Sequence, residues 1–167
     1  MNIFKLLGNQ GPTILFFESL YLLYEKSNYI MYYVGGYIIN FILNILLKFI
    51  IQEPRPFINT KLIKLSKKKS TFFVNKDGSL YSIYGMPSGH AQAVMFSLVF
   101  IYFVLINDKN QKYYLTSYVI ISLLTFYERV KTNVHTKKQV FVGAICGVII
   151  AYICINYANV LDKTILN

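Results

Sequence analysis

The fold is indicated first by one long apolar stretch, residues 29–51, which reads YIMYYVGGYIINFILNILLKFII and continues into QEPRP. It contains a single charge, Lys48, and is long enough to cross the hydrocarbon core of a bilayer as a helix. Asn40, Asn44 and Lys48 recur at every fourth residue, so they share one helix face. Polar groups at that depth are expected to face other helices. The stretch therefore predicts a membrane-spanning helix within a bundle.

Four further apolar segments surround this one, at residues 12–24, 87–106, 113–127 and 139–157. The five segments predict an all-α, multi-pass transmembrane helix bundle of about four to five spans. We expect a single domain over residues 1–167, with its core at 29–157. The first segment is short and carries Glu18, so it could be a short span, re-enter the membrane or lie at the interface. The last segment places Gly143, Gly147 and Ala151 on one close-packing face.

Composition supports a membrane protein. The chain has 167 residues, of which 55% are hydrophobic and 17% aromatic, and its mean hydropathy is +0.45. A soluble globule needs a more polar surface than this. The net charge of +10 comes mainly from Lys and Arg between the apolar segments. That placement favours lipid headgroups or a phosphorylated substrate over nucleic acid.

A basic loop connects the second and third segments, at about residues 57–85. It holds six lysines and the turn signal Asp77-Gly78, which lies between two stretches with strand character, residues 70–74 and 80–84. A small β-hairpin is therefore possible here. The lysines either form a solvated loop or attract an anionic headgroup or substrate.

Three short stretches carry the candidate chemistry, and the predicted topology brings them together. They are residues 48–56, 84–90 and 129–135. The first ends the second segment, and the second begins the third segment on the same membrane face. After two more crossings the chain returns to that face with the third stretch. This expectation depends on the fourth segment spanning the membrane.

The residue types in these stretches suit a phosphate group. Pro87 fits the first position of a helix, and the free backbone N–H groups of Ser88 and Gly89 would then point at an anion. Gly89 would permit close approach, and His90 would lie in the same first turn. Three fixed cations complete the set, Lys48, Arg55 and Arg129. Such positive potential stabilises a phosphoryl group that gains charge in a transition state.

The second histidine has a different setting. His135 lies just before the fifth segment, and Gln139 follows four residues later, so the two side chains can share a helix face. Gln139 could accept a hydrogen bond from one ring nitrogen and leave the other as a nucleophile. His90 could then protonate the leaving oxygen. We expect Gln92 to serve helix packing rather than catalysis.

These stretches resemble the three motifs of the type 2 phosphatidic acid phosphatase superfamily. The motifs Lys-x6-Arg-Pro and Pro-Ser-Gly-His match in full, at residues 48–56 and 87–90. In the third, Ser-Arg-x5-His-x3-Asp, Arg129 and His135 match, but Glu128 replaces the Ser and Gln139 replaces the Asp. The stretches KFIIQEPRP, YGMPSGHAQ and HTKKQV look most like the dolichyl-diphosphatase branch, in which Gln closes the third motif.

The resemblance implies a role for each of these residues. His135 would be the nucleophile that forms a phosphohistidine, His90 would be the general acid, and Gln139 would orient His135. The phosphoryl oxygens would be held by Lys48, Arg55, Ser88, Gly89 and Arg129. No metal and no cofactor would be needed. The reaction would convert dolichyl diphosphate, a polyprenyl diphosphate in the bilayer, to dolichyl phosphate.

Two other functions remain open at this stage. The chain could act on phosphatidic acid or other lipid phosphates, or it could be a catalytically silent protein that binds anionic lipid. The resemblance implies the endoplasmic reticulum membrane, with the site on the lumenal face. The twelve Lys and Arg residues within 48–85 and 128–138 would instead indicate the cytoplasmic face. We follow the resemblance.

Overall fold

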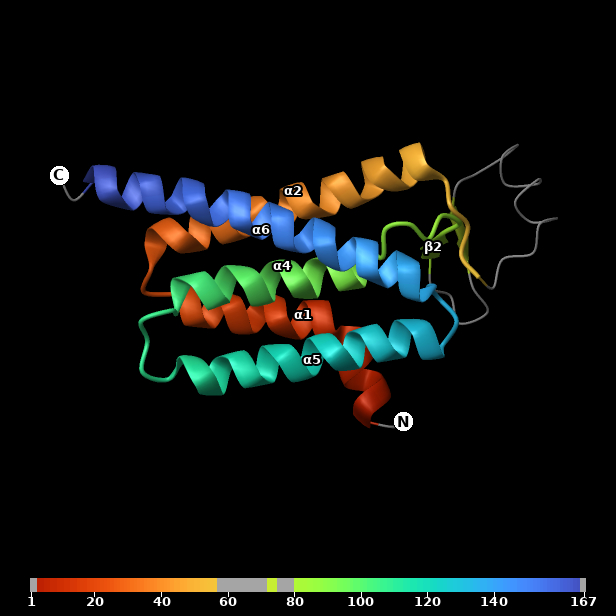
Figure 1. Ribbon diagram of the computed structural model, residues 1–167, viewed down its shortest axis with the longest axis horizontal. Coiled ribbons are helices and arrows are strands. Elements are labelled where there is room, and N and C mark those ends of the chain that lie inside the picture. The colour runs from red at the N-terminus through yellow and green to blue at the C-terminus, as the bar shows by residue number, and fades with distance from the viewer. Residues whose placement is uncertain (1–2, 57–71, 75–79, 166–167) are drawn as a thin grey trace.

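A computed structural model describes residues 3–56, 72–74 and 80–165. Most of the predicted basic loop, including its lysines and the Asp77-Gly78 turn, lies outside the described residues. The described helices are α1 (Ile3–Leu23), α2 (Ser27–Ile51), α4 (Gly89–Val104), α5 (Gln111–Lys131) and α6 (Lys137–Ile165). They run back and forth along the long axis of the molecule (Figure 1). The predicted helical bundle is therefore present in the described part of the chain.

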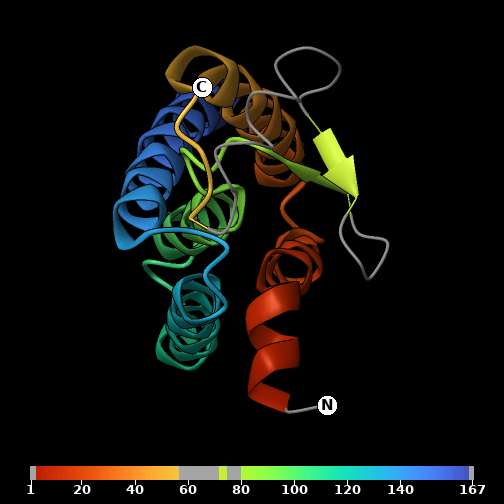
Figure 2. The same cartoon turned by 90° about the vertical axis from the view of Figure 1, so that its right-hand side faces the viewer.

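Helix α4 is the centre of the bundle. It contains no Asp, Glu, Lys or Arg, and it packs against α6, α5, α1 and α2. Figure 2 shows it end-on, between α5 on one side and α2 with α6 on the other. A helix that is apolar on all sides is expected to be buried in this way. Its first turn is consequently surrounded by the ends of the other helices.

The small residues of α6 allow it to lie close to α4. A Cβ atom on Gly147 would overlap the carbonyl oxygen of Gln92, and one on Gly143 would overlap the backbone of Ser88. Ala151 is fully buried on the same face. The predicted close-packing face is confirmed, and its partner is the helix that begins with the Pro-Ser-Gly-His stretch. Backbone contact of this kind fixes the start of α4 relative to α6.

The polar face of α2 points inward, as predicted. Asn40 and Asn44 are buried, and both bond to Gln92 of α4. The Gln92 Nε2 atom donates to Asn40 Oδ1 at 2.9 Å, and the Asn44 Nδ2 atom donates to Gln92 Oε1 at 2.8 Å. Gln92 thus has the packing role expected from the sequence.

Two of the described helices are long and apolar enough to cross a bilayer, over Asn28–Ile51 and Lys137–Val160. Helix α4 is equally apolar but has 16 residues, about 24 Å of rise at 1.5 Å per residue. Helices α1 and α5 each have 21 residues but are less apolar. Length and hydropathy therefore support two spans directly, and the total of four to five stays a prediction.

The first helix is longer than the sequence indicated. The apolar segment was expected at residues 12–24, whereas α1 begins at Ile3 and continues through Pro12. Its N-terminal half is more polar, with Asn9 and Gln10, and is therefore not found by hydropathy. Packing against α5 and α4 stabilises this half as a helix instead.

The predicted hairpin is present. Strands β1 (Phe72–Val74) and β2 (Leu80–Ser82) pair antiparallel, with Phe72 opposite Ser82. Each strand has three residues, fewer than the five expected. An isolated antiparallel bridge joins Pro54 to Tyr84 just beyond β2. The end of α2 is thereby tied to the segment that enters α4.

Candidate active site

Four helix ends meet at the end of the bundle on the right of Figure 1, which faces the viewer in Figure 2. They are the last turns of α2 and α5 and the first turns of α4 and α6. The three stretches predicted to meet therefore do so. A cavity of about 540 Å³ lies there. Six of the eight predicted site residues line it, Lys48, Arg55, Gly89, His90, Arg129 and His135.

The other two predicted residues lie behind the cavity wall. The Ser88 backbone N–H donates to the Gln139 carbonyl oxygen at 3.0 Å, which joins the start of α4 to α6. The Ser88 hydroxyl is buried and has no hydrogen-bond partner among the described residues. A donor in that position is expected to find an acceptor.

Pro87 has a different place from that expected, and Gly89 has a second role. Helix α4 begins at Gly89 with Ser88 as its N-cap, so Pro87 precedes the helix rather than occupying its first position. The Met86–Pro87 peptide bond is cis. A Cβ atom on Gly89 would lie 3.0 Å from Asn44 Oδ1. Gly89 thus allows α2 to approach α4, in addition to lining the cavity.

His135 sits in the connection between α5 and α6, where it is 3% exposed. Its Nδ1 atom lies 3.2 Å from Gln139 Oε1, and its Nε2 atom lies 3.0 Å from an Arg55 guanidinium nitrogen. The expected pairing of His135 with Gln139 across one turn is present. Burial, with Arg55 and Lys48 nearby, lowers the pKa of His135 to about 2. The ring is therefore neutral at physiological pH.

Arg55 is held on two sides. Its guanidinium also donates to the Val134 carbonyl oxygen at 3.4 Å. Its backbone N–H donates to the Ile83 carbonyl oxygen at 3.2 Å, and the side chain is buried. The segment that follows α2 is consequently fixed against the segment that precedes α4, and Arg55 is directed at His135.

His90 faces the same cavity from the first turn of α4 and hydrogen-bonds to the backbone of Asn9. Arg129 lies at the end of α5, and its carbonyl oxygen accepts from the His135 backbone N–H at 3.0 Å. Lys48 enters from the last turn of α2. The two histidines and three cations therefore come from five places along the chain: α2, the segment that follows it, α4, α5 and the connection between α5 and α6.

Sequence reasoning missed the contribution of α1. Asn9, Gln10 and Thr13 also line the cavity. The available signal was the occurrence of adjacent amide side chains next to an apolar segment, since such groups usually face a bundle interior. Glu128, which could have paired with Arg129 or repelled substrate, is buried and does not line the cavity formed by the described residues.

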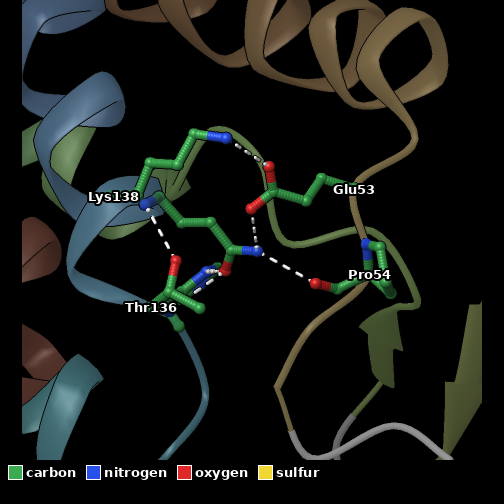
Figure 3. A network of polar contacts seen from close by, with 6 residues as sticks. Glu53, Pro54, Thr136 and Lys138 are labelled. Carbon is green, nitrogen blue, oxygen red and sulfur yellow. Dashed lines mark hydrogen bonds and ion pairs between the residues drawn. The ribbon is translucent and has the colours of Figure 1, made fainter.

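A polar network surrounds Gln139 and was also missed. Glu53 and Pro54 accept hydrogen bonds from the Gln139 side chain, and Lys138 pairs with Glu53 at 3.1 Å (Figure 3). Thr136 caps the first turn of α6, with its hydroxyl accepting from the Gln139 backbone N–H at 3.1 Å. Glu53 belongs to the Gln-Glu-Pro-Arg-Pro stretch, but local sequence gives no sign of its hydrogen bond to Gln139, which lies 86 residues away along the chain.

Known proteins resemble this chain in fold and in family. The fold is similar to that in the crystal structure of Aquifex aeolicus LpxE, with a TM-score of 0.62 and 20% sequence identity, covering 93% of this chain and 84% of that one. At that identity the likeness concerns the fold alone. Among curated proteins, none matches the chain significantly. The PAP2 superfamily matches residues 29–162, well over half of the sequence, and the chain belongs to that superfamily.

Proposed function

We propose that this chain is an integral membrane lipid phosphatase that removes the terminal phosphate of a polyprenyl diphosphate, with dolichyl diphosphate as the expected substrate. The observation that carries the proposal is the meeting of His135, His90 and three cations at one cavity. Membership of the PAP2 superfamily supports phosphatase chemistry. The dolichyl-diphosphatase branch rests on the motif resemblance.

The proposed reaction has two steps. On substrate binding the Arg55 guanidinium turns from His135 Nε2 to a phosphoryl oxygen, which frees the Nε2 lone pair. The neutral His135 then attacks the terminal phosphorus with that lone pair, forming an N–P bond while the bond to the bridging oxygen breaks. His90 gives a proton to that departing oxygen. Water then attacks the phosphohistidine and transfers a proton to His90, the N–P bond breaks, and inorganic phosphate leaves.

The charges of the cavity suit both steps. Lys48, Arg55 and Arg129 would hold the phosphoryl oxygens, together with the Gly89 backbone N–H and the Ser88 hydroxyl. The Ser88 backbone N–H, expected to point at the anion, donates to the Gln139 carbonyl oxygen instead. A bound diphosphate beside His90 favours the protonated form that a general acid needs. With these cations supplied by the protein, we expect no requirement for a divalent metal.

Apolar residues also line the cavity. Tyr37, Phe41, Ile45 and Phe49 of α2 line it, facing Pro12 of α1. The outer faces of α2 and α6 also expose large apolar side chains, including Ile38, Ile42, Ile50, Ile145 and Ile149. Exposed apolar surface on long apolar helices supports a membrane location. The endoplasmic reticulum is proposed from the resemblance.

The test is phosphate release from dolichyl diphosphate by the purified protein in detergent, with EDTA present. We expect release by the wild-type protein and none by His135→Ala. Phosphatidic acid, assayed in parallel, ranks the two lipid classes. Release that requires a divalent metal, or that persists in His135→Ala, would overturn the mechanism. No release from any lipid phosphate would favour the silent lipid-binding alternative.

A further inference from the structure

The side-chain amide of Gln139 is surrounded by groups that allow it one orientation. Its Nε2 atom lies 2.9 Å from Glu53 Oε1 and 2.9 Å from the Pro54 carbonyl oxygen, and both of these atoms only accept. Its Oε1 atom lies 3.2 Å from the Thr136 backbone N–H, which only donates. A reversed amide would place oxygen against two oxygens. The amide oxygen therefore faces His135.

This orientation determines the tautomer of His135. Because Gln139 Oε1 can only accept, the His135 Nδ1 atom at 3.2 Å must carry the proton. The Nε2 atom then has the lone pair, and it lies 3.0 Å from the Arg55 guanidinium, which only donates. The nitrogen that keeps the lone pair is thus the one beside Arg55, another residue of the cavity lining.

Glu53 supplies the negative charge at the far end of this chain of bonds. When His135 forms an N–P bond, its ring gains positive charge, which an acceptor at Nδ1–H stabilises. Gln139 is neutral, but its amide is polarised by the Glu53 carboxylate bound to its NH2 group. The third motif of the superfamily has an Asp beside the histidine, and Gln139 replaces it here. A carboxylate is still present, on Glu53, one side chain further from the imidazole.

The position of Glu53 does not depend on its own side chain. The Glu53 carbonyl oxygen accepts from the Gly85 backbone N–H at 2.7 Å, and the Arg55 backbone N–H bonds to Ile83. The Gly85 backbone in turn packs on Gln139, since a Cβ atom there would overlap the amide. Replacing the carboxylate should therefore leave the surrounding backbone in place.

From this geometry we infer that Glu53 is a positioning residue, which acts through Gln139 to hold the Nδ1–H tautomer of His135 and to stabilise its charged intermediate. The inference rests on the proposed role of His135 as nucleophile. Lys138 pairs with Glu53 from the solvent side, where its side chain is 71% exposed, and has no link to the imidazole. It therefore offers a matched control.

The kinetic test compares Glu53→Gln with Lys138→Met on dolichyl diphosphate. Glu53→Gln keeps the size and an acceptor but removes the charge. We expect kcat to fall about ten- to a hundredfold, as when the hydrogen-bond partner that orients a metal-ligating histidine is removed, with KM within about twofold. Lys138→Met should stay within about twofold of wild type. An equal loss of kcat in both variants would show that Glu53 acts only through its ion pair with Lys138, and would overturn the inference.

A second readout does not require activity. The chain contains two histidines, so ¹⁵N-histidine labelling yields two ring systems, and His90→Gln assigns them. We expect a single Nδ1–H tautomer for His135 in the wild type and a mixture of tautomers in Glu53→Ala. An unchanged tautomer in Glu53→Ala together with unchanged kcat in Glu53→Gln would overturn the inference. If the wild-type protein hydrolyses no lipid, the proposed function fails, and the tautomer alone decides the role of Glu53.

Discussion

Replacing Asn44 with Ala should destabilise the whole bundle, because Asn44 connects α2 to the start of α4. Its Nδ2 atom donates to the Pro87 carbonyl oxygen at 3.2 Å and to Gln92 Oε1 at 2.8 Å, and the residue is 7% exposed. Truncation leaves both acceptors buried without this donor. Each unsatisfied group costs about 1–3 kcal/mol, so we expect a loss of about 2–6 kcal/mol.

Thermal unfolding in detergent measures this loss. For a chain of this size each kcal/mol lowers the midpoint by about 2–4 °C, so Asn44→Ala should unfold at least about 4 °C below wild type. Asn156→Ala, at an exposed position on α6, is the control and should shift the midpoint by less than about 1 °C. An Asn44→Ala midpoint equal to that of the control would refute the reasoning that this amide joins the two helices.

Three further predictions concern packing, pH and charge. Gly147→Leu should prevent α6 from approaching Gln92 and lower the unfolding midpoint by more than about 5 °C, whereas Gly35→Leu, where nothing lies within 4 Å of an added Cβ, should shift it little. His135 has a folded pKa of about 2, below the usual 6.5, so unfolding takes up a proton and this residue alone should lower stability by about 2 kcal/mol from pH 7 to pH 5. Because the pKa of His90 is lowered as well, His135→Gln should make the slope of stability against pH, measured by denaturation curves, shallower without removing it, and an unchanged slope would contradict the assignment. Arg55→Lys replaces the planar guanidinium, which suits bidentate contact with phosphoryl oxygens, by a compact ammonium and should lower kcat/KM about a hundredfold in phosphate-release assays, while Lys131→Met on the exposed surface should not.

The helices that were predicted well are those whose signal is local. Helix α2 was expected at residues 29–51 and observed at Ser27–Ile51, because a long apolar run between charged residues predicts a helix directly. The boundaries of α4 were also within two residues of the expected segment. The N-terminal half of α1 was missed because packing, rather than hydropathy, makes it helical.

The candidate site was predictable to the extent that its residues lie in recognisable motifs. Lys48, Arg55, His90, Arg129 and His135 were all named from spacing and were all found at one cavity. The positions of Pro87 and Gly89 were interpreted from local helix rules, and the structure changed the first interpretation and added a packing role to the second. The local rules could not include the approach of Asn44 from another helix.

The sequence by itself determined which segments are mainly helical and named side chains that were found together at one cavity, since hydropathy and motif spacing are properties of neighbouring residues. The tertiary structure decided the tautomer of His135, the part played by Glu53 and the contribution of Asn9 and Gln10. Each of these depends on atoms that are distant along the chain and meet through backbone packing. Glu53 and Gln139 meet because residues 53–55 pair with residues 83–85, and the Gly85 backbone leaves the Gln139 amide no other position.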